Sequence, residues 1–475
     1  MDPFAPTPAE RRVYANRTLN LRGIRAFGYD MDYTLVQYRS DEWERAAFEH
    51  ARALLVDRGW PAGDLVFNPA AFVQGLAFDL ELGNLVKATR FGYVIRAQHG
   101  TRALPFDELR STYSREYVDL GEPRWEFMNT LFSLSEASLF SQLVDLADRK
   151  ALPEVVGYDD VARALTEALD RSHTQGELKA RIVADPERYV ELDPDLPLAL
   201  LDQRHAGRTL LLITNSDWSY TKAMMSWSMD RFLPEGQTWR DLFDIVIVEA
   251  RKPLFFSERF PAYRMVDEDQ GLLVPHRGPL APGDVYTGGD AHLVETSLGL
   301  SGADILYVGD HLFGDVHVSK DVLRWRTALI LREVEPEIRD AAAFQPRETE
   351  LSVLMAEKAD VDRRLASLRL GRLRTKGGYA PGPEVGPAEL ERHIRETATE
   401  SAALDARIRP LAREAGAMGN ATWGPLMRAG SDKSLFARQV ERYADVYTSR
   451  VSNLLAETPY GYLRAARSSL PHDPT

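Results

Sequence analysis

The feature that most constrains the fold is a short apolar run, residues 24–29, followed at once by two carboxylates, Asp30 and Asp32. An apolar run of this length predicts a buried strand. In an open α/β sheet ligands bind outside the carboxyl ends of the strands, so both carboxylates are expected at a crevice. Side chains alternate in direction along a strand, so Met31 should point elsewhere. The run therefore predicts an α/β sheet with a polar site at its edge.

Two carboxylates at this spacing suit covalent phosphoryl transfer. Asp30 can attack phosphorus and form an aspartyl-phosphate. Asp32 can protonate the leaving oxygen and then deprotonate the water that clears the intermediate. The structural alternative is that Asp32 or Thr34 only caps the following helix, and a short D-x-D-x-T match alone leaves both interpretations open.

Composition narrows the class of protein. With 475 residues the chain exceeds what one core usually holds, so about two or three domains are expected. A net charge of −13 argues against a general nucleic-acid or anionic-membrane surface. The absence of cysteine excludes disulfides, thiolate catalysis and cysteine metal sites. Residues 1–12 lack the apolar centre of a signal peptide and no apolar run approaches membrane-spanning length, so a cytoplasmic protein is expected.

Two later apolar runs, residues 209–214 and 244–249, also end in polar residues. Asn215 and Ser216 follow the first run at a helix start, where hydroxyl and backbone N–H groups can hold phosphate oxygens. Lys252 follows the second run and can neutralise a cluster of aspartates and phosphate at the sheet edge. A simple helix cap and a solvated lysine are the structural alternatives.

The run 304–309 ends in a glycine-flanked pair of acids, Asp310 and Asp315. Carboxylates in this position suit a divalent cation. His311 and His317 keep a transition metal open as an alternative, but hard oxygen ligands beside a phosphate favour Mg²⁺.

The segment between the first two runs predicts a mixed helix and strand insert. Residues 43–56 have apolar residues at helical spacing, and residues 84–96 have the pattern of a hairpin. Such an insert can act as a cap that excludes water from the reacting phosphate. Residues 129–132 and 169–179 combine polar and aromatic side chains that can line a substrate pocket, although core and surface roles are the commoner explanation.

Beyond Arg332 the pattern is helical. Residues 351–370 and 387–414 predict a helical hairpin, and residues 434–455 a further amphipathic helix. The basic run 369–376 fits a solvated helix face better than a nucleic-acid site on so acidic a chain. The expected domains are the core at 1–36 and 197–345, the cap at 37–196 and the helical extension at 346–475.

Five segments carry a family resemblance: residues 30–35, 129–132, 250–256, 309–315 and 435–445. The order and residues of these segments are similar to those of the haloacid dehalogenase superfamily. Within that superfamily the chain resembles the cytosolic purine 5'-nucleotidase family. The resemblance implies a Rossmann-like core with a parallel sheet, an inserted α+β cap and a helical C-terminal extension. It also implies Mg²⁺, hydrolysis of purine nucleoside 5'-monophosphates, phosphate transfer to nucleosides, and a homodimer or homotetramer.

The resemblance also implies individual residue roles. The catalytic residues are Asp30, Asp32, Thr214 and Lys252, and the metal site is formed by Asp30, Asp32 (through its carbonyl), Asp310 and Asp315. The substrate-binding residues are Phe132, Asp170, His173, Lys179, Asn215 and Ser216, with Phe132 and His173 stacking on the purine. Ser133 and Thr166 depart from the family's base-reading residues, so the preferred base stays open. Residues of a nucleotide effector site are retained at Asn129, Phe313, Gln439 and Arg442, but an arginine is lost near Asp119 and Asp321 replaces a lysine. The loss of these cations weakens the case for a polyphosphate effector.

The sequence therefore predicts a magnesium-dependent phosphohydrolase acting on a nucleotide, with neither nucleic acid nor membrane as partner. Two alternatives remain at this stage. One is a phosphatase for another small phosphorylated metabolite, and the other is a non-catalytic scaffold of the same fold.

Overall fold

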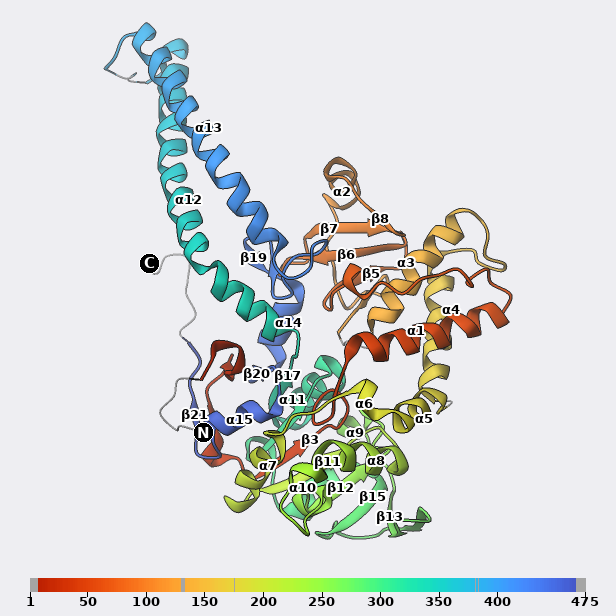
Figure 1. The fold of residues 1–475 in the computed structure, drawn as a ribbon. Helices are drawn as coiled ribbons and strands as arrows, with labels where there is room; N and C mark the ends of the chain where they lie inside the picture. Colours follow the sequence, from red (N-terminus) through yellow and green to blue (C-terminus); the bar gives the residue numbers. More distant parts are fainter. Residues whose placement is uncertain (1–6, 130–132, 175, 381, 383, 467–475) are drawn as a thin grey trace. The chain divides into compact units, whose positions relative to one another are not determined.

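The computed structural model describes residues 7–129, 133–174, 176–380, 382 and 384–466 (Figure 1). The chain forms two compact units, one of residues 1–335 with 426–475 and one of residues 336–425. The first unit contains both the central sheet and the inserted cap, and the second is a helical hairpin. The predicted boundaries between core, cap and extension stay a prediction.

Among the described residues, the largest sheet has ten strands, six of whose neighbouring pairs are parallel. Antiparallel pairs close both edges. In sheet order the strands are β1 (Tyr14–Ala15), β20 (Val446–Thr448), β17 (Arg326–Ile330), β16 (Ile305–Gly309), β3 (Ala26–Tyr29), β11 (Thr209–Ile213), β12 (Ile245–Val248), β15 (Asp284–Gly288), β13 (Ala262–Asp267) and β14 (Leu272–Pro275). The predicted α/β class with a parallel core sheet is confirmed.

Both faces of this sheet are covered, as parallel sheets require. Alternate residues of β3 enter two separate hydrophobic clusters: Phe27 and Tyr29 belong to one, and Ala26 belongs to the other. Gly28 is needed for close packing, because a Cβ there would lie 2.9 Å from the ring of Tyr307 on the neighbouring strand. The helices beside the sheet are α7 (Leu196–His205), α8 (Trp218–Met229), α9 (Leu254–Ser257), α10 (Ala291–Leu298), α11 (Val318–Leu323), α14 (Leu435–Tyr443) and α15 (Leu454–Glu457).

The insert after β3 is the α+β cap that the sequence predicts. Its antiparallel sheet runs β8 (Arg102–Ala103), β7 (Val94–His99), β6 (Asn84–Ala88), β5 (Ala77–Asp79) and β9 (Trp125–Phe127). Its helices are α1 (Ser40–Asp57), α2 (Phe106–Tyr113), α3 (Leu134–Asp148), α4 (Tyr158–Thr174), α5 (Glu177–Ala184) and α6 (Pro186–Tyr189). The predicted helix over 43–56 corresponds to α1, and the predicted hairpin corresponds to β6 and β7.

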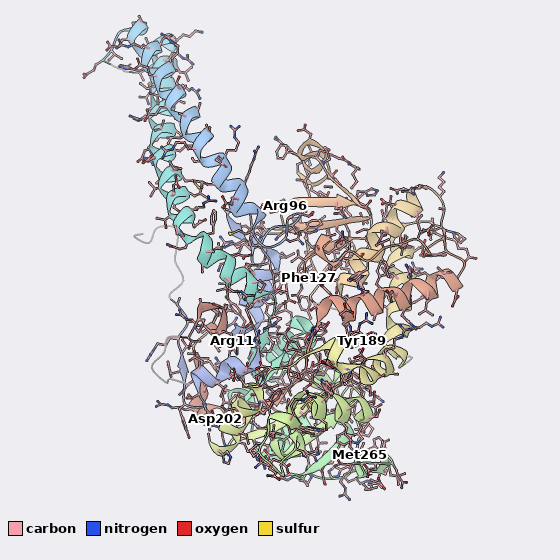
Figure 2. All side chains as sticks on the ribbon, in the orientation of Figure 1. Arg11, Arg96, Phe127, Tyr189, Asp202 and Met265 are labelled. Carbon is pink, nitrogen blue, oxygen red and sulfur yellow. The ribbon has the colours of Figure 1, made fainter. Side chains whose placement is uncertain are left out.

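The chain enters and leaves the cap through two short strands that pair with each other. β4 (Gln37–Tyr38) lies antiparallel to β10 (Val190–Glu191), with Tyr38 opposite Val190. The pairing continues beyond the strands, since the N–H of Arg39 donates to the carbonyl of Tyr189 at 2.7 Å; Figure 2 labels Tyr189. The two linkers of the cap therefore form one ribbon.

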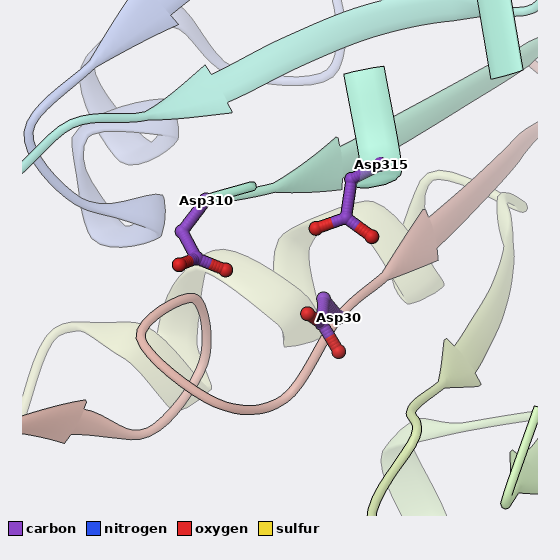
Figure 3. A group of neighbouring side chains, drawn as sticks. All are labelled: Asp30, Asp310 and Asp315. Carbon is purple, nitrogen blue, oxygen red and sulfur yellow. The ribbon is translucent and has the colours of Figure 1, made fainter. Parts of the chain in front are cut away.

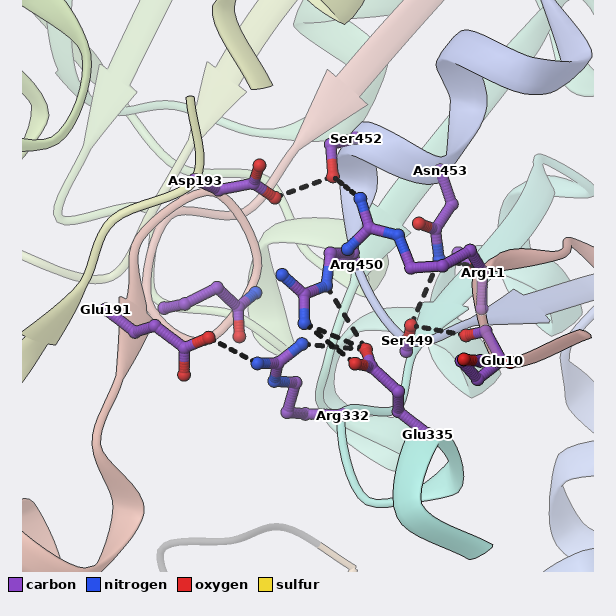
Figure 4. Close-up of polar contacts among 12 residues, drawn as sticks. Glu10, Arg11, Glu191, Asp193, Arg332, Glu335, Ser449, Arg450, Ser452 and Asn453 are labelled. Atoms are coloured by element: carbon purple, nitrogen blue, oxygen red, sulfur yellow. Dashed lines mark hydrogen bonds and ion pairs between the residues drawn. The ribbon is translucent and has the colours of Figure 1, made fainter. Parts of the chain in front are cut away.

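Ion pairs fix the second linker to the core (Figure 4). Arg332 binds Glu191 of β10 and also Glu335, the latter at 2.8 Å. Arg450 binds Glu335 at 2.9 Å, and both side chains are largely buried. Removal of one partner from a partly buried, hydrogen-bonded ion pair costs more stability than removal of one partner from an exposed pair. The network therefore contributes to holding the base of the cap to the C-terminal segment.

The C-terminal segment corrects one prediction. The helix expected over 434–455 ends at Tyr443, and β20 follows it. Val446, Tyr447 and Thr448 are β-branched or aromatic residues that pair with β17 and β1 in the core sheet. Long-range pairing of this kind overrides the local helical pattern. Two small ribbons complete this unit, β2 (Leu19–Asn20) with β21 (Tyr462–Leu463) and β18 (Arg428–Ala429) with β19 (Asp432–Lys433).

The second unit is the predicted helical hairpin, formed by α12 (Val334–Gly377) and α13 (Pro387–Ala417). Two apolar clusters lie between the helices, one around Leu354 and Leu404 and one around Leu365 and Leu390. Cross-helix ion pairs such as Lys358 with Asp405, at 3.1 Å, flank them. Among the described helices of the whole chain, none has the length and apolar character needed to cross a membrane.

Candidate active site

Four neighbouring strands of the core sheet end in the polar residues that the sequence singled out. Asp30 follows β3, Thr214 follows β11, Asp310 follows β16, and Lys252 lies in the loop after β12. Because these strands are parallel, their carboxyl ends share one edge of the sheet. All four residues line a single cavity of about 640 Å³, together with Asp32, Lys179, Asn215 and Asp315.

The centre of the cavity is a lysine between two carboxylates. Nζ of Lys252 lies 2.8 Å from Oδ1 of Asp30 and 2.8 Å from Oδ1 of Asp315. It also donates to the hydroxyl of Tyr307 at 3.1 Å. The Lys252 side chain is only 4% exposed, so its charge is compensated by these carboxylates rather than by water.

Burial governs the protonation of these groups. It raises the pKa of Asp30 to about 7, although the charge of Lys252 opposes the shift. Burial also raises the pKa of Asp310 well above its ordinary value, and the charges of Asp30 and Asp315 add to the effect. Burial lowers the pKa of Lys252, but the two carboxylates outweigh it and the pKa ends above its ordinary value. The cluster is therefore short of positive charge.

The carboxylates of Asp30, Asp310 and Asp315 face one another, as Figure 3 shows, with ligand atoms all within 4.8 Å. This donor set fits a hard divalent cation such as Mg²⁺, which prefers oxygen ligands, and a cation would supply the missing positive charge. Among the described residues, the cluster includes no histidine. Nδ1 of His311 instead accepts the N–H of Gly314, and His317 pairs with Asp321.

Asp32 is held by two hydroxyl groups. Its Oδ1 accepts from the Tyr38 hydroxyl at 2.6 Å, and its Oδ2 accepts from Oγ of Ser216 at 2.7 Å. The tight turn after Asp32 includes Tyr33 at φ 53°, a left-handed conformation that non-glycine residues adopt rarely. Met31 is fully buried in the core cluster, as its position between the two aspartates predicts.

The loop after β11 is fixed by hydrogen bonds to its own side chains. Oγ1 of Thr214 accepts the N–H of Ser216, and Asp217 caps α8 by accepting the N–H of Tyr220. The Asn215 amide accepts the N–H of Lys252 at 2.6 Å and donates to its carbonyl at 3.0 Å. In this structure Asn215 therefore joins the two loops that carry Thr214 and Lys252, and its predicted contact with substrate stays a prediction.

The cap contributes Lys179 to the cavity. Its Nζ lies 3.2 Å from Oγ of Ser216 and 3.7 Å from Oδ2 of Asp217. Phe132 lies outside the described residues. Asp170 and His173 lie on α4, but their side chains are also outside the described part of the structure. The predicted base-stacking pair is therefore untested.

The two residues that depart from the family pattern lie on cap helices. Ser133 precedes α3 at its N-cap position, and Oγ1 of Thr166 donates to the carbonyl of Ala162 within α4. Two of the residues expected at an effector site contact one aromatic cluster: the Phe313 ring is 5.9 Å from Phe127 and 6.0 Å from Tyr443, and the Arg442 guanidinium lies 5.0 Å from the centre of the Tyr443 ring.

Sequence reasoning missed three aromatic residues of the site. Trp43 lines the cavity, while Tyr38 and Tyr220 lie behind Asp32, with their hydroxyl oxygens 2.9 Å apart. A signal for Tyr220 exists, because it is the third residue after the helix cap Asp217 and so lies in the first turn beside the strand end. No local pattern brings Tyr38, from the cap linker, to the same place.

An α/β sheet whose edge gathers paired aspartates, a buried lysine and hydroxyl groups defines a phosphoryl-transfer enzyme. The chain belongs to the 5' nucleotidase family, whose family model matches residues 13–475. The enzyme is accordingly a phosphoric monoester hydrolase, as the sequence predicts.

Two similar proteins are 5'-nucleotidase domain-containing proteins. The chain is 30% identical to human 5'-nucleotidase domain-containing protein 2, over 93% of this chain and 81% of that protein. It is 28% identical to a 5'-nucleotidase domain-containing protein of Dictyostelium discoideum, over 98% of this chain and 76% of that protein. A solved structure of a β-phosphoglucomutase from Pyrococcus sp. strain ST 04 aligns with 65% of this chain and 86% of its own, at 10% identity and a TM-score of 0.31.

Proposed function

We propose that the protein is a Mg²⁺-dependent 5'-nucleotidase that hydrolyses purine nucleoside 5'-monophosphates through an aspartyl-phosphate. The observation that carries the proposal is the contact of Lys252 with both Asp30 and Asp315, beside a third aspartate, Asp32, that is held by hydroxyl groups. A fold alone does not require a buried nucleophile, a buried lysine and a positioned acid in one cavity.

In the first step Oδ of Asp30 attacks phosphorus, and the bond from phosphorus to the 5'-oxygen breaks. Asp32 gives its proton to that oxygen, so that the nucleoside leaves as a neutral alcohol. Lys252, with hydroxyl and N–H groups around Thr214, stabilises the negative charge on the transferring phosphoryl group. Lys252 also counters the effect of burial on Asp30 and so favours the carboxylate that attacks.

In the second step Asp32 takes a proton from a water molecule, and the water oxygen attacks phosphorus and releases Asp30. A nucleoside hydroxyl in place of water would make the same step a phosphate transfer. Asp30, Asp310, Asp315 and the main-chain carbonyl of Asp32 would hold Mg²⁺, which when bound neutralises the anionic groups that must approach one another.

The substrate proposal rests on Phe132 and His173, the pair that the family resemblance places on either face of the purine. An aromatic face binds any purine, at about 1 to 3 kcal/mol per base. Ser133 and Thr166 replace the base-reading residues, and a missed buried hydrogen bond costs about 1 to 3 kcal/mol. We therefore expect several purine monophosphates to be hydrolysed with flatter discrimination than a 6-oxopurine preference. The cytoplasmic location and the homo-oligomer also stay predictions.

The test is phosphate release from a panel of purine and pyrimidine monophosphates and sugar phosphates, with Mg²⁺ and with a chelator. Phe132→Ala should raise KM for every purine monophosphate. Phe106→Ala, which removes a 71% exposed cap phenylalanine, is the matched control and should leave KM unchanged. A base-free sugar phosphate as the best substrate would refute the nucleotide proposal and favour the general phosphatase. Turnover that continues in the presence of the chelator would refute the proposed dependence on Mg²⁺.

A further inference from the structure

Two tyrosines that no motif marks form a chain of hydroxyl groups leading to Asp32. The Tyr38 hydroxyl lies 2.6 Å from Oδ1 of Asp32, and the Tyr220 hydroxyl lies 2.9 Å from that of Tyr38. Tyr38 has one hydroxyl proton and donates it to the carboxylate. The hydrogen bond between the two tyrosines must therefore be donated by Tyr220. The hydrogen bonds thus run from Tyr220 to Tyr38 and from Tyr38 to Asp32.

A second chain reaches the other oxygen of the same carboxylate. Nζ of Lys179 donates to Oγ of Ser216, which donates to Oδ2 of Asp32 at 2.7 Å. The two series of hydrogen bonds are also in contact, because Lys179 Nζ lies 4.9 Å from the centre of the Tyr220 ring. Both oxygens of Asp32 are thus held, and the carboxylate has one orientation toward the cavity.

The packing around the tyrosines makes this orientation rigid. Tyr38 and Tyr220 are 4% and 2% exposed. The Tyr38 ring packs against Tyr33, at 5.2 Å between ring centres, and against Trp43 at 4.6 Å. Tyr38 belongs to β4, the first cap linker, whereas Tyr220 belongs to the first turn of the core helix α8. Removal of the Tyr38 hydroxyl would leave the rings in place and free Oδ1 of Asp32, whereas removal of the Tyr220 hydroxyl would free only the hydroxyl of Tyr38.

We propose that Tyr38 and Tyr220 are positioning residues that hold the general acid and base of the reaction in its working orientation. The inference rests on the role of Asp32 in the proposed function. Proton transfer by a positioned side chain contributes about 10²- to 10⁴-fold to a rate, and a loosely held carboxylate loses part of that contribution. The loss falls on the chemical steps and leaves substrate binding unchanged.

The experiment compares Tyr38→Phe, Tyr220→Phe and the double variant with wild type and Asp32→Asn. The control is Tyr113→Phe, because the Tyr113 hydroxyl also donates to a buried carboxylate, that of Asp79 in the cap, at 2.9 Å. The substrates are p-nitrophenyl phosphate and whichever nucleoside or sugar monophosphate the wild type hydrolyses fastest. Circular dichroism and thermal melting check the fold of each variant.

Tyr38→Phe should lower kcat for the nucleoside or sugar monophosphate, whose leaving alcohol needs a proton, about tenfold. KM should change by less than about twofold. In a single turnover of p-nitrophenyl phosphate the release of p-nitrophenolate should keep its wild-type rate, because this leaving group departs as the anion and needs no proton from Asp32. Tyr220→Phe should have a smaller effect, and the double variant should match Tyr38→Phe, since Tyr220 acts through Tyr38.

Wild-type kcat in a folded Tyr38→Phe variant would overturn the inference, and so would an equal loss in Tyr113→Phe. An equal slowing of both leaving groups in the first step would also overturn it, because it would indicate general damage. If Asp32→Asn slows turnover while Tyr38→Phe does not, the positioning role fails and the proposed function stands. A wild type that hydrolyses none of the phosphate esters refutes both.

Discussion

Asp30 combines burial with a direct contact to Lys252, which is what a nucleophile at phosphorus needs: a carboxylate held in place and partly neutralised. Asp30→Asn keeps the shape of the side chain and removes the oxygen that forms the acyl phosphate in the proposed mechanism. We expect a folded protein without turnover. Phosphate release and acid-trapped phosphoenzyme measure this directly, with the exposed Asp64→Asn as the control. Turnover in purified Asp30→Asn would exclude the aspartyl-phosphate mechanism.

The metal site can be tested without activity. The carboxylates of Asp30, Asp310 and Asp315 repel one another, and Lys252 contacts only Asp30 and Asp315, so Mg²⁺ that binds only the folded protein should raise the melting temperature. Asp310→Asn removes one ligand and part of the repulsion. The variant should therefore melt higher than wild type without the ion and gain less from it, whereas Asp64→Asn should behave as wild type. An equal Mg²⁺ response in Asp310→Asn would exclude this cluster as the binding site.

The residues of this site differ in how far the sequence reveals them. Asp30, Thr214, Lys252 and Asp310 each follow an apolar run, and parallel strands bring such positions to one edge, so their proximity follows from local pattern. The contact between Tyr38 and Tyr220 spans 182 residues and depends on how the cap linker lies against α8. Neither periodicity nor a motif encodes that contact.

At the scale of elements, the long helices could be predicted from the sequence, whereas the short strand β20 near the C-terminus could not. The periodicity of residues 43–56, 351–370 and 387–414 places α1, α12 and α13 because each helix buries one face against a neighbour. β20 contains only Val446–Thr448 and exists because β17 and β1 offer hydrogen-bonding partners on both sides. A short strand that forms only by pairing with residues distant in sequence cannot be predicted from a local sequence pattern.

The packing of α1 on α3 predicts a pH-dependent stability. Glu44 of α1 is fully buried, and its carboxylate accepts the N–H of Ser135 in the first turn of α3 at 2.7 Å. Burial raises the pKa of Glu44 from its ordinary value of 4.5 to about 8, although this hydrogen bond opposes the shift. The folded state therefore binds the proton more tightly than the unfolded state. This contribution to stability is complete below pH 4.5 and is lost as the pH rises through about 8.

Glu44→Gln keeps an acceptor for Ser135 and removes the ionisation. Relative to this variant, the free energy of unfolding of wild type should fall by on the order of a few kcal/mol between about pH 5 and pH 8. Urea unfolding at several pH values measures the difference. Glu49→Gln, an exposed position on the same helix, should follow wild type at every pH. Parallel curves for wild type and Glu44→Gln would contradict the buried acid.

At the scale of the whole molecule, the two ends of the chain complete the core. β1 near the N-terminus pairs with β20 near the C-terminus, and β20 joins the parallel sheet through β17. The family model accordingly extends over residues 13–475 rather than over the catalytic strands alone. Arg450 pairs with Glu335, Glu335 pairs with Arg332, and Arg332 pairs with Glu191, so this network connects the same C-terminal segment to the cap linker. The site thus depends on segments that are distant in sequence.

The helical hairpin of residues 336–425 leads to the prediction about assembly. Four apolar side chains of α12 are at least 43% exposed, a pattern that suits contact with another protein surface: Val353, Met355, Leu370 and Leu373. With the family resemblance, we expect a homodimer or homotetramer in which this helix takes part. Light scattering should give a multiple of 53.5 kDa at micromolar concentration. Leu370→Glu with Leu373→Glu should shift the mass toward the monomer, because a buried unpaired charge costs several kcal/mol.

The control for this pair is Val156→Glu, which adds a charge at a 96% exposed valine of the cap and should leave the mass unchanged. Leu370 and Leu373 lie in the hairpin and outside the active site, so kcat per chain should stay at the wild-type value if assembly only stabilises the protein. A fall in kcat that parallels dissociation would instead show that assembly supports catalysis. A wild-type mass of 53.5 kDa would contradict the oligomer and leave the exposed leucines as solvated positions of the hairpin.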